Sequence, residues 1–280
     1  MSHSPVTPRT VALTFFTLIA FASNSVLCRL ALAPGLIGAG TFTGVRLLSG
    51  AMMLMLLVAL RGRATAVQGS WGSAVALFAY AAPFSFAYLR IPTGVGALVL
   101  FGTVQATMIG SDLLKGKRLR STELAGLILA VSGLTVLTLP GVSAPDPAGV
   151  GLMVVAGVAW GIYSLRGRAA IDPLKSTATN FSRSLLFAMP LGIASLGYET
   201  FTLPGVSYAI ASGAMASGLG YALWYTALRG LTATQAGIVQ LLVPALAAIG
   251  GILLLGESVS LRLLFAGLTI LAGVALAVRR

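Results

Sequence analysis

The sequence predicts an all-α polytopic membrane protein, with ten transmembrane helices arranged as two inverted five-helix repeats around a central cavity. Three observations lead to this prediction: long apolar blocks recur along the chain, basic residues gather at alternate block ends, and the two halves share a weak repeat. The composition agrees, because 57% of the 280 residues are hydrophobic and only 9% are charged, whereas a soluble domain usually carries about 25% charged residues.

The apolar blocks give the individual spans. A helix needs about 20 apolar residues to cross the bilayer core, and blocks of that length, such as 41–60 and 233–255, recur too often to be buried helices of a soluble core. The alternating pattern of a membrane β-barrel is absent. Proline, glycine and charged residues divide the chain into ten predicted spans: 11–32, 38–60, 71–90, 92–114, 122–140, 148–168, 176–197, 206–228, 232–255 and 261–278.

Boundaries in the sequence separate these spans in order. The first span follows the polar segment 1–10, and it is too long for a signal peptide and lacks a small-residue cleavage site. The fourth ends at the basic run 115–120, and the fifth ends at the longest apparent linker, PGVSAPDP at 140–147. Because this linker lies midway, we expect one five-helix repeat in residues 1–142 and a second in residues 143–280.

The basic residues orient the spans. If the N-terminus is cytoplasmic, 13 of the 18 Lys and Arg residues fall on the cytoplasmic side, as the positive-inside rule requires. Both termini are then cytoplasmic, which needs an even number of spans. Because the basic residues stand at span ends, the net charge of +12 indicates contact with anionic lipid head groups, and no nucleic-acid partner is expected.

An internal repeat divides the ten spans into five plus five. Shifts of 137 and later 140 residues superpose arginine, aromatic and glycine residues in order: Arg29 with Arg166, Arg46 with Arg183, Phe84 with Tyr221, Tyr88 with Tyr225, and Gly133 with Gly273. Five is odd, so the halves enter the membrane from opposite sides. Inverted repeats are typical of alternating-access transporters, although a duplicated channel and an inert scaffold remain alternatives.

The spans also carry motifs of a known family. FASNSVLCRLAL (21–32), an arginine in the second span at Arg46, and IVQLLVPALAAIGGILLLGESVS (238–260) resemble the ten-helix EamA-type exporters of the drug/metabolite transporter superfamily. The chain departs from that pattern at LLKGKRL (113–119), where the family usually shows Gly-Glu, and at Gln105, where Pro is common. The match looks nearest to the bacterial aromatic amino-acid exporter subgroup.

This resemblance implies a function. It implies a multi-pass protein of the bacterial inner (cytoplasmic) membrane that exports small amphiphilic metabolites, including neutral and aromatic amino acids. The alternatives are an exporter of another metabolite or drug-like compound, a channel, and a lipid-handling membrane protein.

The predicted substrate cavity is aromatic, with a few amide groups. Tyr and Trp offer an apolar ring with a polar edge, their faces attract ammonium groups, and polar residues at membrane depth need a partner or a wet cavity. The candidates are Asn24, Tyr80, Phe84, Gln105, Trp160, Tyr163, Tyr221, Trp224 and Tyr225. Helix packing and interfacial aromatic belts are the alternatives, and the belt is favoured for Tyr88, which lies near a span end.

Two arginines lie inside spans without an acidic partner in any span interior. For Arg46 and Arg183 we favour snorkelling toward the nearer interface, with hydrogen bonds to helix-end carbonyls; contact with a substrate carboxylate is the alternative. Four glycines in two GxxxG patterns predict close helix packing: Gly40, Gly44, Gly157 and Gly161. Glu257, at a span end, is expected to pair with local basic groups or to stabilise a helix end.

The sequence offers little for catalysis. Its one histidine is His3, in the polar N-terminal segment, and it has no Cys/His cluster for a metal, no Walker motif and no dinucleotide loop in a βαβ context. We therefore expect no enzyme, no metal and no cofactor. The expected partners are a small-molecule substrate and the lipid bilayer, with the chain acting as a monomer. Because proton-coupled carriers commonly use an embedded acid or histidine, we expect transport without such a proton relay.

Overall fold

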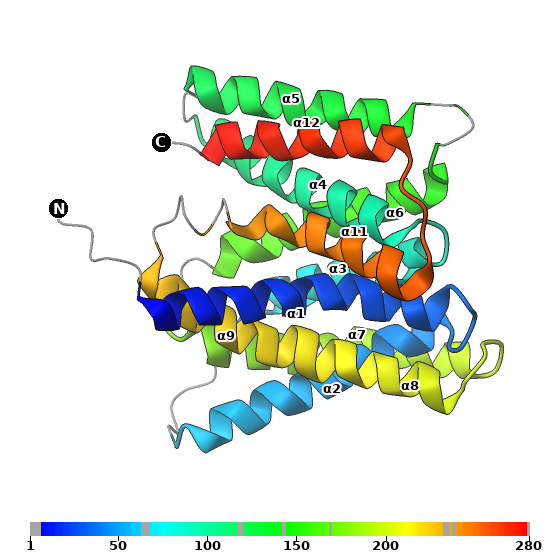
Figure 1. Cartoon of the computed structure of the whole chain (residues 1–280). Coiled ribbons are helices and arrows are strands. Elements are labelled where there is room, and N and C mark those ends of the chain that lie inside the picture. Colours follow the sequence, from blue (N-terminus) through cyan, green and yellow to red (C-terminus); the bar gives the residue numbers. More distant parts are fainter. Residues whose placement is uncertain are drawn as a thin grey trace.

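The computed structural model describes residues 7–62, 68–116, 120–139, 141, 144–167, 170–231, 236 and 239–278. Across these residues the chain is helical, and the one β-type pairing is an isolated antiparallel bridge between Ile37 and Phe201. The helices run side by side in one bundle, and α1 begins and α12 ends at the same end of it (Figure 1). We call this end the mouth end and the opposite one the closed end.

The first half of the chain supplies five helices: α1 (Pro8–Leu32), α2 (Ala39–Leu60), α3 (Trp71–Tyr88), α4 (Thr93–Leu114) and α5 (Ser121–Thr138). The second half begins with α6 (Pro147–Gly167) and α7 (Pro173–Leu196). The next span is continuous and consists of α8 (Leu203–Ile210), η1 (Ala211–Leu219), α9 (Gly220–Ala227) and the single turn η2 (Leu228–Gly230). The last two helices are α11 (Leu242–Leu255) and α12 (Leu261–Val278).

The ten-span prediction is confirmed, with helix ends within three residues of those predicted, except in the ninth span. There α11 begins at Leu242, and six earlier positions of that span, 232–235 and 237–238, lie outside the described residues. The predicted boundary between residues 142 and 143 also lies outside them. Pro244 stands in the first turn of α11, where a proline removes no intrahelical hydrogen bond.

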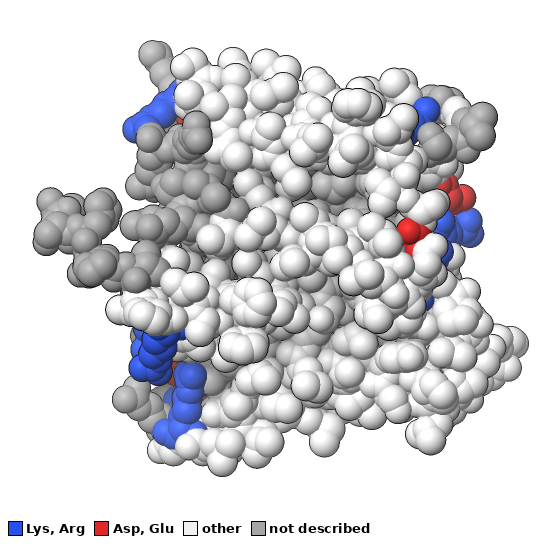
Figure 2. Space-filling model, in the orientation of Figure 1, with Lys and Arg blue, Asp and Glu red and all other residues white. Residues whose placement is uncertain are grey.

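The outer surface fits a bilayer. Five helices, α1, α2, α4, α5 and α6, are long and apolar enough to cross a membrane by length and composition. Large apolar side chains such as Phe16, Met52 and Leu253 are exposed on the helix flanks. Figure 2 shows charged side chains near the two ends of the bundle and a broad uncharged band between them.

The contact between α5 and α12 carries the symmetry of the inverted repeat. A Cβ atom built on Gly133 would lie 3.0 Å from the backbone oxygen of Ala266, and one built on Gly273 would lie 2.6 Å from the backbone oxygen of Gly126. Adding 140 to 133 and 126 gives 273 and 266, so each contact is the repeat-related copy of the other. This reciprocity is what a two-fold relation between the halves produces.

Close packing at the GxxxG glycines is confirmed. On α2, a Cβ on Gly40 would lie 3.4 Å from the backbone oxygen of Leu191 on α7. On α6, a Cβ on Gly157 would lie 3.0 Å from the backbone oxygen of Leu100 on α4. Small residues let helix backbones approach in the membrane, and these contacts join helices of the two halves.

The eighth span contains a feature that the sequence did not predict. Its middle nine residues, Ala211–Leu219, form a π-helical segment. A Cβ on Gly213 would overlap the backbone oxygen of Arg46, so the backbones of η1 and α2 touch there. π-helical segments are frequent at functional sites. Two residues of η1, Ala216 and Ser217, line the central cavity of the bundle.

Candidate functional site

A cavity of about 540 Å³ lies inside the bundle, walled by helices from both halves of the chain. The structure places all nine predicted residues on its wall: Asn24, Tyr80, Phe84, Gln105, Trp160, Tyr163, Tyr221, Trp224 and Tyr225. Its volume lies within the range of small-molecule sites, about 300–1,000 Å³. Contact of these side chains with a substrate stays a prediction.

The cavity extends from the middle of the bundle toward the mouth end. Its inner part is formed by Asn24 on α1 and by Tyr80 and Phe84 on α3. Its outer part is formed by Gly167 at the end of α6 and Leu228 just after α9, and both of these helix ends lie at the mouth end (Figure 1). The cavity is therefore approached from one end of the molecule.

Trp160 forms the centre of the aromatic wall. Its ring lies 4.8 Å from that of Tyr80, 5.3 Å from that of Tyr163 and 5.4 Å from that of Tyr221, measured between centroids. These rings come from α3, α6 and α9, so the wall spans both halves. Such a wall can accept an apolar side chain against its faces and an ammonium group by cation–π attraction.

A chain of buried hydrogen bonds lies at the inner end of the cavity, where Asn24 and Tyr80 line the wall. The Ser212 hydroxyl on η1 donates to Oδ1 of Asn24 at 2.7 Å, and Nδ2 of Asn24 donates to the Tyr80 hydroxyl at 3.2 Å. Nη2 of Arg46 on α2 donates to the same hydroxyl at 3.0 Å. The guanidinium also lies 4.8 Å from the centroid of the Phe84 ring. Four helices thus meet at one polar cluster.

The snorkelling prediction is wrong for Arg46. Its side chain is 2% exposed and points into the bundle, because the Tyr80 hydroxyl and the Tyr80 and Phe84 rings offer it local partners. Its repeat-related counterpart, Arg183, is half-buried and lies 5.2 Å from the ring of Trp71 at the start of α3, where Trp71 is 53% exposed. Arg183 therefore fits the snorkelling prediction and Arg46 does not.

The interfacial-belt prediction for Tyr88 is also wrong. Its side chain is completely buried, its ring packs edge-on against Phe84 with centroids 4.8 Å apart, and its hydroxyl donates to the backbone oxygen of Thr93 at 3.3 Å. The Tyr88 ring packs closely against α4, where a Cβ built on Gly96 would overlap it, and this is why a span-end tyrosine is buried here.

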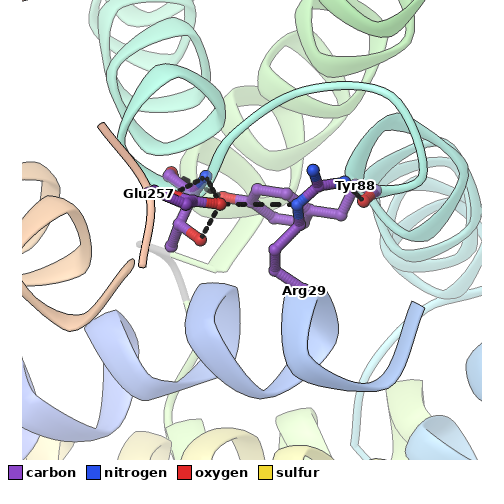
Figure 3. Close-up of polar contacts among 4 residues, drawn as sticks. Arg29, Tyr88 and Glu257 are labelled. Carbon is purple, nitrogen blue, oxygen red and sulfur yellow. Dashed lines mark hydrogen bonds and ion pairs between the residues drawn. The ribbon is translucent and has the colours of Figure 1, made fainter. Parts of the chain in front are cut away.

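A polar closure seals the closed end of the bundle (Figure 3). Nε of Arg29, near the end of α1, lies 3.4 Å from Oε1 of Glu257, and its Nη1 donates to the backbone oxygen of Tyr88 at 2.6 Å. The Glu257 carboxylate also accepts hydrogen bonds from the backbone N–H of Thr93 at 2.8 Å and from its hydroxyl at 3.1 Å. The expected role of Glu257 is confirmed: it pairs with a basic group and stabilises a helix N-terminus.

A second carboxylate at the closed end acts in the same way. Glu199, between α7 and α8, accepts from the backbone N–H groups of Gly40 at 3.2 Å and Thr41 at 3.1 Å, in the first turn of α2. Both contacts join loops of the second half to helix starts of the first half. They can be released without breaking any helix.

Several residues of the cavity wall were not among those predicted from the sequence. Phe21 lies three positions before Asn24, and Phe101 and Met108 lie four before and three after Gln105; all three line the cavity. Residues three or four apart share a helix face. The same spacing, applied around each predicted polar residue, would have identified them.

Several known proteins are similar to this chain in sequence or in fold. Residues 147–279, the second five-helix half, match the profile of the EamA-like transporter family. An uncharacterized protein of Pseudomonas aeruginosa, PA1977, is 52% identical over 96% of this chain and 94% of its own length. The threonine/homoserine exporter RhtA of Escherichia coli K12 is 29% identical over 70% of this chain and 67% of its own. A solved crystal structure, 20% identical, has a TM-score of 0.63 and covers 94% of this chain and 95% of its own, which shows the fold.

Proposed function

The chain belongs to the EamA-like transporter family, and we propose that it exports small amphiphilic metabolites, chiefly neutral and aromatic amino acids, by alternating access. One observation carries the proposal: a single cavity walled by both halves of the chain extends to one end of the bundle, while Arg29 and Glu257 close the other end. This arrangement is expected for an alternating-access carrier in a conformation that is open to one side of the membrane.

The chemistry of the wall supports the substrate class. Aromatic rings predominate, with the amides of Asn24, Gln105 and Gln240 and the hydroxyls of Ser25 and Ser164, and the described wall residues include no Asp, Glu or His. A zwitterion with an apolar or hydroxylated side chain suits such a wall, because ring faces attract its ammonium group. The E. coli relative is named for export of threonine and homoserine, both neutral amino acids, and the ring cluster around Trp160 favours aromatic side chains as well.

The orientation of the protein follows from its charges. We infer that the mouth end is cytoplasmic, since Arg61, Lys115, Arg166 and Arg229 lie at the helix ends there and cytoplasmic loops carry an excess of Lys and Arg. The cavity then faces the cytoplasm, ready to load a metabolite for export across the bacterial inner membrane. The two repeats are residues 1–142 and 143–280, and one chain contains a complete cavity, so a monomer suffices.

Efflux from intact cells tests this function. Cells with and without the protein are loaded with dipeptides of phenylalanine or threonine, which hydrolyse inside, and the free amino acid that appears outside is measured. We expect faster efflux with the protein, with a rate that saturates as the internal amino acid rises, and loss of this gain in Trp160→Ala. Equal efflux from both cell types would contradict amino-acid export. Efflux that rises without saturation would indicate a channel.

A further inference from the structure

Tyr80 and Asn24 line the inner end of the cavity, and Arg46 lies behind them, where it donates to the Tyr80 hydroxyl; we call these three residues the polar floor. We propose that this polar floor is the subsite for a carboxylate group, and that Arg46 supplies its positive charge. The transported metabolites are then distinguished by a free carboxylate rather than by an apolar side chain alone. This inference rests on the proposed function, because it assigns an orientation to the exported metabolite.

The Arg46 side chain is buried, and only part of its guanidinium group is hydrogen-bonded. It is 2% exposed, and among the described residues no acceptor binds its Nε or Nη1. Its one hydrogen-bonded side-chain partner among the described residues is the Tyr80 hydroxyl, at 3.0 Å from Nη2. A buried charge without a counter-charge strongly disfavours folding, so a purely structural role leaves this arginine unexplained.

Neither of the two ion pairs found among the described residues involves Arg46. Glu257 pairs with Arg29, and Asp146 pairs with Arg90, both toward the closed end. Arginine is always protonated in proteins, and its guanidinium matches the geometry of a carboxylate. An anionic ligand is therefore the partner that its charge calls for.

Tyr80 links the charge of Arg46 to the cavity. Tyr80 lines the cavity, and its hydroxyl accepts from both Arg46 and Asn24, at 3.0 and 3.2 Å. Both of these partners are donors, which leaves the proton of the hydroxyl for a ligand. A hydroxyl that accepts from a guanidinium is also a stronger donor, since hydrogen bonds in a chain polarise one another. A carboxylate oxygen is a suitable acceptor for it.

The distances between Arg46, Tyr80 and Trp160 fit the size of an α-amino acid. A carboxylate bound at the Tyr80 hydroxyl would lie about 5 Å from the guanidinium, within the range of strong attraction in a protein interior. The Trp160 ring lies 4.8 Å from the Tyr80 ring, so the ammonium group of the same α-amino acid can lie against an aromatic face. The side chain then points toward Met108, which lies nearer the mouth end of α4.

Binding to purified protein in detergent tests the subsite, with phenylalanine compared with phenylalaninamide, which lacks the negative charge. We expect the wild-type protein to prefer the acid, and Arg46→Gln to weaken acid binding about tenfold to hundredfold while leaving amide binding unchanged. Arg46→Lys should recover much of the preference. Arg183→Gln, the repeat-related control, should change neither affinity.

A second variant, Tyr80→Phe, tests the carboxylate subsite independently of Arg46. Tyr80→Phe keeps the ring and deletes the hydroxyl, and we expect the same selective loss of acid binding. An equal loss of acid and amide in both variants, or equal affinity of the wild-type protein for both ligands, would overturn the carboxylate subsite and leave amino-acid export standing. Failure of the wild-type protein to bind any amino acid would overturn both proposals.

Discussion

Arg29 on α1 and Glu257 in the α11–α12 connection form an ion pair, with Nε and Oε1 3.4 Å apart, on the side of the bundle away from the cavity mouth. Both side chains are mostly buried, with exposed fractions of 19% and 14%, and the carboxylate also binds the N-terminus of α4. For the cavity to reach the other side of the membrane, α1 and α4 must separate from this connection. Under the proposed alternating-access mechanism, the pair therefore sets part of the balance between inward-open and outward-open states.

Glu257→Gln should shift that balance toward the outward-open state. The change removes an ion pair and a charge at a helix N-terminus, together about 1–2 kcal/mol, so we expect an increase of about tenfold in the outward-open population. Cys28, the chain's one cysteine, is completely buried next to Arg29 and reports the opening directly. We expect its labelling by a membrane-impermeant maleimide from outside to accelerate about tenfold.

Glu123→Gln is the matched control for this labelling. Glu123 accepts from the backbone N–H of Arg120 at 2.9 Å at the start of α5, so its loss affects another helix end and should leave the labelling rate of Cys28 unchanged. Equal labelling rates in Glu257→Gln and the wild-type protein would show that the ion pair does not hold the closure.

Gly273→Ala should loosen the contact between α5 and α12. The new Cβ would lie 2.6 Å from the backbone oxygen of Gly126, so the helices must move apart, at a cost of about 1–3 kcal/mol. Thermal unfolding in detergent measures the loss. Gly151→Ala, on α6, is the control: its Cβ would meet nothing within 4 Å, and we expect a gain of about 1 kcal/mol from helix propensity. Similar melting temperatures for both variants would contradict the packing argument.

Trp160 should report ligand binding by its fluorescence. It is one of three tryptophans and lies in the stacked rings of the cavity wall, so a bound amino acid changes its environment. We expect a saturable fluorescence change on titration with phenylalanine, retained in Trp71→Phe and reduced by more than half in Trp160→Phe. Because Trp224 also lines the cavity, a signal that persists in full in a variant without Trp160 and Trp224 would place the binding site elsewhere.

Arg46→Met should melt no lower than the wild-type protein. Replacing a buried, uncompensated charge by an apolar side chain of similar length is often neutral or stabilising, and we expect a rise in melting temperature of about 0–4 °C. Thermal unfolding without ligand measures it. A fall of more than about 5 °C would show that Arg46 is needed for folding rather than for binding.

Transport should not depend on a proton gradient. The described wall residues include no acid and no histidine, the groups that commonly relay protons in coupled carriers. We expect net uptake of labelled amino acid into proteoliposomes, down its own gradient, to proceed at the same rate with and without a protonophore. Uptake that requires an imposed proton gradient would show that a relay exists.

Much of the fold could be predicted from the sequence, because the bilayer imposes simple rules. Apolar length, charge at span ends and the glycine pair Gly133 and Gly273 gave the helices, their number and the relation between the halves. The π-helical segment of the eighth span was not predictable: nothing local in ASGAMASGL distinguishes it from an α-helix, and its backbone contact with α2 depends on tertiary packing.

The residues of the cavity wall could be predicted from the sequence, whereas the burial of Arg46 and Tyr88 could not. Aromatic and amide side chains at membrane depth face inward for reasons present in the sequence, as for Trp160 and Gln105. The burial of Arg46 and Tyr88 could not be read in this way, since a residue's distance from a span end says nothing about which neighbouring helix covers it. Arg46 and Arg183 are equivalent in the repeat and lie in different environments.

Counterflow in proteoliposomes tests the central claim most directly: vesicles loaded with unlabelled phenylalanine or threonine are diluted into the radiolabelled amino acid, and its uptake is followed for the wild-type protein and Trp160→Ala. Alternating access through the aromatic cavity predicts transient, saturable accumulation of label with the wild-type protein and little with the variant. Uptake that is absent in the wild-type protein, or that is linear in concentration and equal in both proteins, would contradict it.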